Sequence, residues 1–314
     1  MKFALVFPGQ GSQSLGMMSA YGDSAVVRAT FDEASSAIGK DLWALVADGP
    51  AEALNQTVNT QPLMLTAGVA VFRLWQAKGG AIPALVAGHS LGEYAALVAA
   101  GVMKLSDAAP LVELRATAMQ EAVPAGEGAM AAVLGLDAEA VKLACAEITR
   151  ETPLLVVQAV NFNDPKQTVI AGHKSAVERA AELVKARGAK RALMLPVSAP
   201  FHCSLMQPAA LRLKQRLVSV PLSAPRISVI NNVDVSMLTD ADAIRDALVR
   251  QAASPVRWVE TMLAMQTEGV TQVLECGPGK VLAGLAKRCA DGLTGVPMND
   301  LVAVEAALTL TSRN

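Results

Sequence analysis

Apolar residues follow two alternating patterns along the chain. Short continuous apolar runs, typical of buried parallel strands, occur at KFALVF (2–7), IPALVAGHS (82–90), RISVINNV (226–233) and TQVLECG (271–277). Between these runs, apolar residues recur every three or four positions, as in the predicted helix LGEYAALVAA (91–100). Strands that alternate with helices predict an α/β fold built on a parallel sheet.

The middle of the chain has a different order of elements. The pattern predicts strand 128–136, helix 137–150, strands 154–161 and 167–173, helix 175–188 and strand 191–197. This βαββαβ order is that of a ferredoxin-like unit. We therefore expect residues 126–197 to form a small domain, inserted into a larger α/β body made of residues 1–125 and 198–314.

Composition narrows the functional classes. Of the 314 residues 52% are hydrophobic, which is enough for a large core. Lys plus Arg number 27 and Asp plus Glu 28, and this balance argues against a nucleic-acid or general membrane binder. The four cysteines form no C-x-x-C pair, so we expect neither a disulfide framework nor a zinc site. Without an apolar run long enough to span a bilayer, the chain is expected to be cytoplasmic.

The stretch GHSLG (88–92) joins a predicted strand to a predicted helix and matches the G-x-S-x-G nucleophile elbow. Glycines permit the sharp, strained turn that such an elbow requires. The hydroxyl of Ser90 would then stand at a helix N-terminus, where backbone N–H groups stabilise an oxyanion. The alternative is a glycine-rich turn whose serine only caps the helix.

A serine nucleophile needs a base, and the sequence contains three histidines. His89 adjoins the serine and its side chain should point away, while His173 ends a predicted strand before a helix and suits a surface or capping role. Elimination leaves His202, in SAPFHCS (198–204), as the general base, although a loop histidine is often structural. A backbone carbonyl could orient its imidazole as well as a carboxylate; the unranked carboxylates are Asp107, Asp164 and Asp234.

Arg115 is placed unusually for a charged residue. It lies four positions from both Leu111 and Met119, on the apolar stripe of a predicted helix. A buried guanidinium is costly unless it meets an anion. The residue therefore forms either a structural salt bridge or a bidentate clamp for a substrate carboxylate.

Two other glycine-rich stretches do not fit nucleotide motifs. FPGQGSQSLG (7–16) has Ser14 where a dinucleotide fingerprint needs its third glycine, and CGPGK (276–280) lacks the spacing of a Walker A loop. The first stretch is either an ordinary strand-to-helix turn or a segment that brings the backbone N–H of Gln10 close to the elbow.

Four stretches together resemble the malonyl-CoA:acyl carrier protein transacylases: PGQGSQ (8–13), GHSLGEY (88–94), APFHCS (199–204) and ECGPGK (275–280). They occur in the order found in that family and span almost the whole chain. The resemblance implies a hydrolase-like parallel-sheet body with a ferredoxin-like insertion, which agrees with the βαββαβ pattern.

The resemblance also implies the catalytic roles. Ser90 corresponds to the acylated nucleophile and His202 to its partner, in a dyad that needs no carboxylate. Gln251 matches a glutamine whose backbone carbonyl orients the histidine.

Binding roles follow from the same resemblance. The backbone N–H groups of Gln10 and Leu91 match an oxyanion hole, and Arg115 matches the arginine that grips the malonyl carboxylate. Phe201 is similar to the residue found in malonyl-selective members, and Asn161 matches a residue that lines the cleft.

We therefore expect a malonyl group to pass from CoA to Ser90 and then to the phosphopantetheine thiol of an acyl carrier protein, supplying fatty-acid synthesis. No metal or cofactor is expected, and a monomer suffices. An acidic carrier would need a basic surface; the candidates are Lys190 and Arg191, with Lys185 and Arg187 beside them, and Lys287 and Arg288. These cations could equally be solvated charges without a partner.

Other functions remain open at this point. A serine esterase or thioesterase would use the same elbow, and a carrier-docking module would have a dead site. Within the transacylases, the chain could serve a polyketide line in trans or load a malonate decarboxylase.

Overall fold

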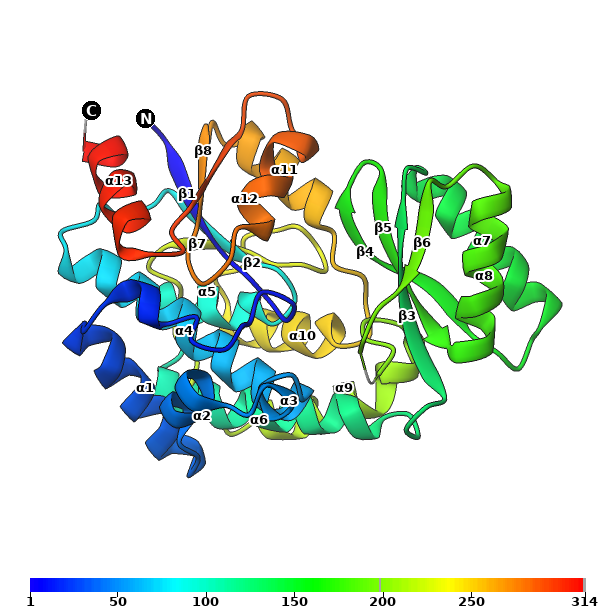
Figure 1. Ribbon diagram of the computed structural model, residues 1–314, viewed down its shortest axis with the longest axis horizontal. Coiled ribbons are helices and arrows are strands. Elements are labelled where there is room, and N and C mark those ends of the chain that lie inside the picture. The colour runs from blue at the N-terminus through cyan, green and yellow to red at the C-terminus, as the bar shows by residue number, and fades with distance from the viewer. Residues whose placement is uncertain (198, 313–314) are drawn as a thin grey trace.

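The computed structural model describes residues 1–197 and 199–312, and it contains two β-sheets side by side (Figure 1). The strands are β1 (Phe3–Phe7), β2 (Leu85–Gly88), β3 (Gly128–Leu134), β4 (Val157–Asp164), β5 (Gln167–His173), β6 (Arg191–Met194), β7 (Ser228–Ile230), β8 (Gln272–Glu275) and β9 (Thr294–Pro297).

The α-helices lie between these strands, except between β4 and β5, and four of them follow one another between β1 and β2, while the last follows β9. In the described ranges, short 3₁₀ helices span Ser19–Tyr21 and Ser204–Met206. The α-helices are α1 (Ala25–Ile38), α2 (Leu42–Asp48), α3 (Ala51–Leu54), α4 (Thr57–Ala77), α5 (Gly92–Ala99), α6 (Leu105–Glu121), α7 (Ala138–Glu151), α8 (Lys174–Ala186), α9 (Gln207–Leu217), α10 (Ala241–Gln251), α11 (Trp258–Thr267), α12 (Val281–Cys289) and α13 (Leu301–Ser312). None of the helices in the described ranges is long and apolar enough to cross a membrane.

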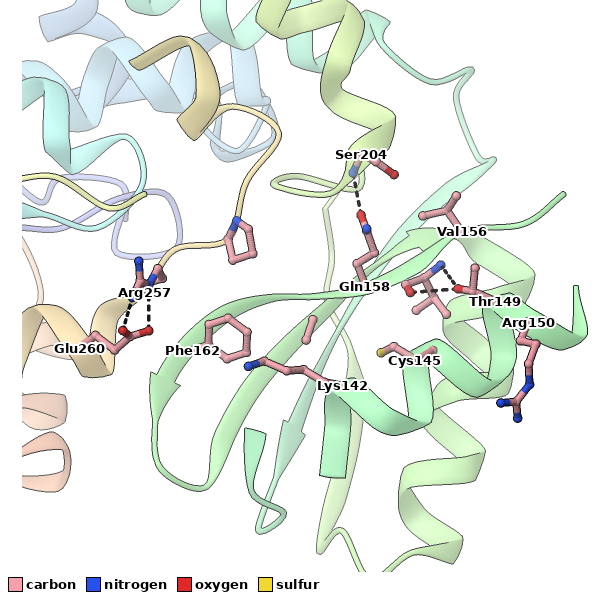
Figure 2. A pocket seen from close by; sticks show the side chains of 14 residues that line it. Lys142, Cys145, Thr149, Arg150, Val156, Gln158, Phe162, Ser204, Arg257 and Glu260 are labelled. Carbon is pink, nitrogen blue, oxygen red and sulfur yellow. Dashed lines mark hydrogen bonds and ion pairs between the residues drawn. The ribbon is translucent and has the colours of Figure 1, made fainter. Parts of the chain in front are cut away.

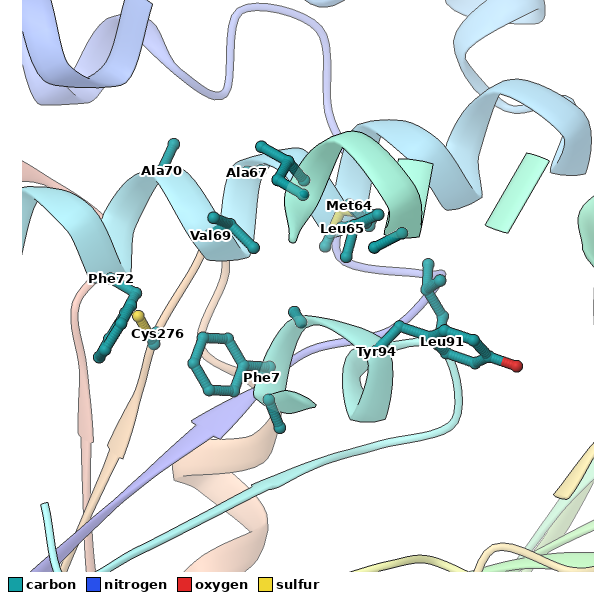
Figure 3. Packing of buried hydrophobic residues seen from close by; sticks show 14 of the residues in the cluster. Phe7, Met64, Leu65, Ala67, Val69, Ala70, Phe72, Leu91, Tyr94 and Cys276 are labelled. Atoms are coloured by element: carbon teal, nitrogen blue, oxygen red, sulfur yellow. The ribbon is translucent and has the colours of Figure 1, made fainter. Parts of the chain in front are cut away.

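The first sheet is parallel and has the order β7-β2-β1-β8-β9 within the described residues. Successive side chains of a strand point to opposite faces, and β1 follows this rule. Phe3, Leu5 and Phe7 pack against α1, α4 and α5, whereas Ala4 and Val6 pack against α11 and α12. Figure 3 shows Phe7 between α4 and α5 in the first of these layers. The parallel sheet is therefore buried between two helical layers, as its continuous apolar strands predict.

The second sheet is antiparallel and has the order β4-β5-β3-β6 among the described residues. Ala131 and Val133 of β3 point to the face that α7 and α8 cover. Met130, on the opposite face, packs with residues of α6 and α9 from the first unit. The second sheet thus lies against the end of the parallel-sheet unit where the chain leaves β2.

The predicted α/β layout and the strands of both units are confirmed, with corrections to their ends. The strand predicted over 82–90 ends at Gly88, because the next two residues make the turn into α5. The strand predicted over 191–197 ends at Met194, two residues before Pro196, which has no N–H to donate to a sheet. Strand β9 was not predicted. The predicted domain boundary at 198 lies outside the described residues and remains a prediction.

Candidate active site

Ser90 occupies a strained turn between β2 and α5, with a φ angle of 53°. The flanking glycines are required by close packing. A Cβ atom on Gly88 would lie 1.8 Å from the backbone carbon of Gly92, and one on Gly92 would lie 2.0 Å from the carbonyl oxygen of Phe7. The backbone conformation and the packing are those of a nucleophile elbow.

His202 faces this serine from a segment 112 residues further along the chain. Its Nε2 atom lies 2.6 Å from Oγ of Ser90, and its Nδ1 atom lies 2.9 Å from the backbone carbonyl oxygen of Gln251. The carbonyl can only accept, so Nδ1 carries the proton and Nε2 is free to accept the seryl proton. Of the alternatives that the sequence left open, the orienting group in this structure is a backbone carbonyl.

His202 is suited to act as a neutral base. It is 3% exposed, and burial, together with the nearby charge of Arg115, lowers the pKa of its imidazole to about 3. The imidazole is therefore unprotonated at neutral pH.

Arg115 points into the same site from α6 and is 1% exposed. Its Nη1 donates to Oε1 of Gln61 at 2.7 Å, and its Nη2 donates to Oε1 of Gln251 at 3.0 Å and to Oγ of Ser90 at 3.2 Å. The ring of Tyr94 lies 5.5 Å from the guanidinium carbon. All these partners are neutral, and among the described residues Arg115 makes no salt bridge. The geometry therefore favours an anion clamp over the structural ion pair.

The cavity at the dyad has a volume of about 110 Å³ and lies between the elbow, α6 and the second sheet. Its lining residues come from both units and include Gln10, Gln61, Ser90, Leu91, Arg115, Met130, Asn161, Leu195, Phe201 and His202. The cavity thus brings together every residue to which the resemblance gave a catalytic or binding role except Gln251, which contacts the dyad from behind.

The loop after β1 lies against the elbow. A Cβ atom on Gly9 would be 2.7 Å from the carbonyl oxygen of His89, so this close approach requires a glycine. In the part of the chain that the structure describes, neither the amide of Gln10 nor that of Leu91 donates a hydrogen bond. Both residues line the cavity, so their amides are candidate donors to an oxyanion.

The other two histidines lie outside the dyad. Nε2 of His89 is 2.8 Å from Oδ1 of Asn163, and the ring packs 5.3 Å from that of Trp258. Nδ1 of His173 accepts a hydrogen bond from the backbone N–H of Val156 at 2.8 Å. Both therefore have structural partners of their own.

Three polar residues at the site were not singled out in the sequence: Gln61, Glu93 and Asn232. The side chain of Asn232 is fully buried and accepts a hydrogen bond from the backbone N–H of Ser90 at 2.7 Å. Glu93 is 2% exposed, and burial raises the pKa of its carboxyl to about 7. The sequence feature that could have indicated a buried polar residue was Glu93 itself, which lies inside the apolar run of α5.

A second, larger cavity of about 820 Å³ lies between α7, β4 and the start of α11 (Figure 2). Among the charged residues that line it, Lys142 lies 4.9 Å from the ring centre of Phe162, and Arg257 pairs with Glu260. Burial raises the pKa of the Cys145 thiol to about 12, so this cysteine is not a thiolate at neutral pH. The cavity holds no second nucleophile–base pair, and no cluster suited to a metal occurs among the described residues.

The basic residues considered for docking fall into two separate places. Arg191, Leu134, Gln167 and Asp164 form one row across the second sheet. Asp164 ends this row three strand spacings, roughly 14 Å, from Arg191, and Arg288 pairs with Asp164 at 3.1 Å. Lys190 and Arg191 are exposed at the opposite edge.

Comparison with known proteins identifies the family. The model of the acyl transferase domain matches residues 4–303. The malonyl CoA-acyl carrier protein transacylase of Salmonella typhimurium is 56% identical over 98% of this chain and 99% of that protein.

Solved structures agree with this assignment. The acyl-carrier-protein S-malonyltransferase of Burkholderia pseudomallei has a TM-score of 0.96 and 59% identity, covering 98% of this chain and 100% of that one. A malonyl-transacylase solved in complex with its type II polyketide acyl-carrier protein has a TM-score of 0.96 and 53% identity, covering 99% of this chain and 100% of that one. The chain therefore belongs to the acyl transferase domain family and, within it, to the malonyl CoA-acyl carrier protein transacylases.

Proposed function

We propose that this protein transfers a malonyl group from malonyl-CoA to the phosphopantetheine thiol of an acyl carrier protein through a malonyl-serine intermediate. The observation that carries the proposal is the position of Arg115. Its buried guanidinium has no salt bridge to any residue that the structure describes, lies 3.2 Å from the seryl oxygen and lines the cavity of the dyad. The names of the relatives, which are malonyl transacylases of acyl carrier protein, support the same reaction.

In the first half of the reaction, the oxygen of Ser90 attacks the thioester carbonyl of malonyl-CoA while Nε2 of His202 takes the seryl proton. The oxyanion that forms is stabilised by the amides of Gln10 and Leu91. Collapse of this intermediate breaks the carbon–sulfur bond, and His202 returns the proton to the departing CoA thiolate.

In the second half, His202 accepts the proton of the phosphopantetheine thiol, whose sulfur attacks the malonyl-serine ester. The ester bond breaks and Ser90 regains its proton from His202. Arg115 binds the free malonyl carboxylate in both halves, and Asn161 and Phe201 shape the space around the acyl group. The proposed steps use side chains and backbone amides, with CoA and phosphopantetheine as substrates and no cofactor.

We also infer that residues 126–197 form a ferredoxin-like insertion in a hydrolase-like body. The β-α-β-β-α-β order and the strand order β4-β5-β3-β6 are typical of that unit and support the inference. In this arrangement Met130 and Asn161 of the insertion form one wall of the acyl cavity.

The decisive experiment mixes the protein with malonyl-CoA and follows the protein by intact mass spectrometry. A stable adduct of malonyl mass, absent from Ser90→Ala and discharged by a holo acyl carrier protein, supports transfer. Steady release of malonate without an adduct would instead identify a thioesterase. The rate at which malonyl-serine is discharged can then be compared for carrier proteins from fatty-acid synthesis and from polyketide synthesis. The carrier that is malonylated faster indicates the pathway that the protein serves.

A further inference from the structure

Side-chain amides hold both backbone polar groups of the nucleophile. The N–H of Ser90 donates to Oδ1 of Asn232 at 2.7 Å, and its carbonyl oxygen accepts from Nε2 of Gln251 at 2.9 Å. Asn232 follows β7 and Gln251 ends α10. Two separate segments of the chain therefore form hydrogen bonds with the backbone of Ser90.

These two amide residues share one carboxylate. Oε2 of Glu93 accepts from the backbone N–H of Asn232 at 2.9 Å and from Nε2 of Gln251 at 3.0 Å. All three residues are buried. The arrangement is a closed polar network. While Glu93 is ionised, its carboxylate can only accept, and this fixes the orientation of the Gln251 amide.

Asn232 makes one further contact, which explains why an amide is needed there. Its Nδ2 donates to the carbonyl oxygen of Gly88 at 2.7 Å while its Oδ1 accepts from Ser90. One side chain therefore bridges the elbow from the residue before His89 to the residue after it. A non-glycine residue in the left-handed region is strained and persists only where its surroundings hold it.

We propose that Asn232 is a positioning residue of the acyl transfer, and that its side-chain amide, anchored through its backbone to Glu93, keeps the oxygen of Ser90 within reach of His202. The inference rests on the proposed function. It also explains why the oxyanion donors are the amides of Gln10 and Leu91, since the amide of Ser90 is already used.

The substitution Asn232→Asp separates positioning from general structural support. An ionised aspartate can accept from Ser90 but repels the carbonyl oxygen of Gly88, whereas a protonated aspartate can both accept and donate. Asn232 contacts two residues with charged side chains, Glu93 on α5 and Arg257 before α11. Arg115 on α6 and Asp234 act on Glu93, and His202 contacts Ser90. The carboxylate of Glu93 and the carbonyl of Gly88 favour the protonated form, and the cations oppose it.

The experiment measures the rate constant for single-turnover formation of malonyl-serine between pH 5.5 and 8.5. The result at each pH is expressed as the ratio of the variant's rate constant to that of the wild type. We expect Asn232→Asp to be slower by about 10²-fold at pH 8.5, as for a misplaced reacting group. The ratio should recover toward unity as the pH falls, with an unchanged KM for malonyl-CoA. Asn231→Asp is the matched control, because among the described residues the side chain of Asn231 contacts Asp234 and Ser236 of its own turn and not Ser90, so its ratio should not vary with pH.

A ratio near unity at every pH, or a low ratio that does not change with pH, would overturn the proposal. If Asn232→Asp does not fold, Asn232→Ala is measured instead. A lower kcat of Asn232→Ala with an unchanged KM would support the positioning role, and a kcat equal to that of the wild type would refute it. Labelling of Ser90 by a fluorophosphonate is measured in parallel. Wild-type protein that is labelled but never malonylated would refute the proposed function, while the labelling rates would still test Asn232.

Discussion

The backbone carbonyl oxygen of Gln251 lies 2.9 Å from Nδ1 of His202, in the place where many serine enzymes have a carboxylate. Because a carbonyl carries no full charge, it stabilises an imidazolium less than a carboxylate would. Burial and the nearby charge of Arg115 lower the pKa of the imidazole, and the carbonyl offsets this only in part, so the imidazole remains neutral.

The pH dependence of acylation should reflect this environment. His202 acts as a base only when unprotonated, and its pKa of about 3 keeps it unprotonated throughout mild acid. We expect single-turnover acylation to show no loss near pH 6.5, the ordinary histidine value, and to fall only below about pH 4. Glu93→Gln is measured in parallel because Glu93, with a pKa of about 7, is the other buried group that titrates nearby. A half-maximal rate near pH 6.5 in both proteins would contradict the expectation.

Replacing the base should slow chemistry without weakening binding. Since general-base catalysis contributes roughly 10²–10⁴-fold, His202→Asn should reduce the acylation rate by about that factor. Rapid-quench mass spectrometry of the malonyl adduct measures the rate. His173→Asn is the control, because it keeps an acceptor for Val156 and should acylate normally. Equal rates in the two variants would exclude His202 as the base.

Arg115 should determine selectivity between acyl groups. Removing a buried charged partner costs about 2–5 kcal/mol, so Arg115→Ala should lower kcat/KM for malonyl-CoA roughly 30-fold or more. Acetyl-CoA, which has no free carboxylate, should lose far less. Arg73→Ala, which removes a cation paired with Glu33 away from the site, serves as the control. A parallel loss with both thioesters would show that Arg115 supports the fold and not the carboxylate.

The elbow glycines should be intolerant of a methyl group. A Cβ atom on Gly92 would lie 2.0 Å from the carbonyl oxygen of Phe7, so Gly92→Ala must push α5 away from β1. We expect the free energy of unfolding to fall by about 1–3 kcal/mol or more, as for other overpacked sites. Gly284→Ala on α12 meets nothing within 4 Å and should be neutral or stabilising by up to about 1 kcal/mol. Urea unfolding measures the free energy of unfolding of both variants, and equal values would contradict this expectation.

Carrier docking should depend on one edge of the second sheet more than on the other. Lys190 and Arg191 are exposed there, whereas the charge of Arg288 is already paired with Asp164. We expect Lys190→Glu with Arg191→Glu to raise the KM for acyl carrier protein, with a smaller effect at higher salt, and to leave acylation by malonyl-CoA unchanged. Lys287→Glu should have less effect. A larger rise in this KM for Lys287→Glu than for the Lys190→Glu, Arg191→Glu variant would place docking at the edge near Arg288.

Local patterns in the sequence predicted most of the strands, although not β9, and indicated Ser90 as the candidate nucleophile. Continuous apolar runs predicted the buried strands, and GHSLG predicted an elbow because glycines on both sides of a serine satisfy a local steric requirement. Elimination among three histidines indicated His202, and the apolar stripe around Arg115 indicated a buried cation.

The tertiary structure alone decided which groups meet. Residue patterns by themselves left Arg115 between an ion pair and an anion clamp, and left the orienting group of His202 open; only the family resemblance implied the clamp and the carbonyl of Gln251. It contained no sign that Asn232, 142 residues from Ser90, would bridge the elbow. That contact exists because β7 pairs with β2, which places the residues after both strands together at one edge of the sheet. Periodicity along a chain records local conformation and burial, but a partner across a sheet depends on the strand order, which no local pattern encodes.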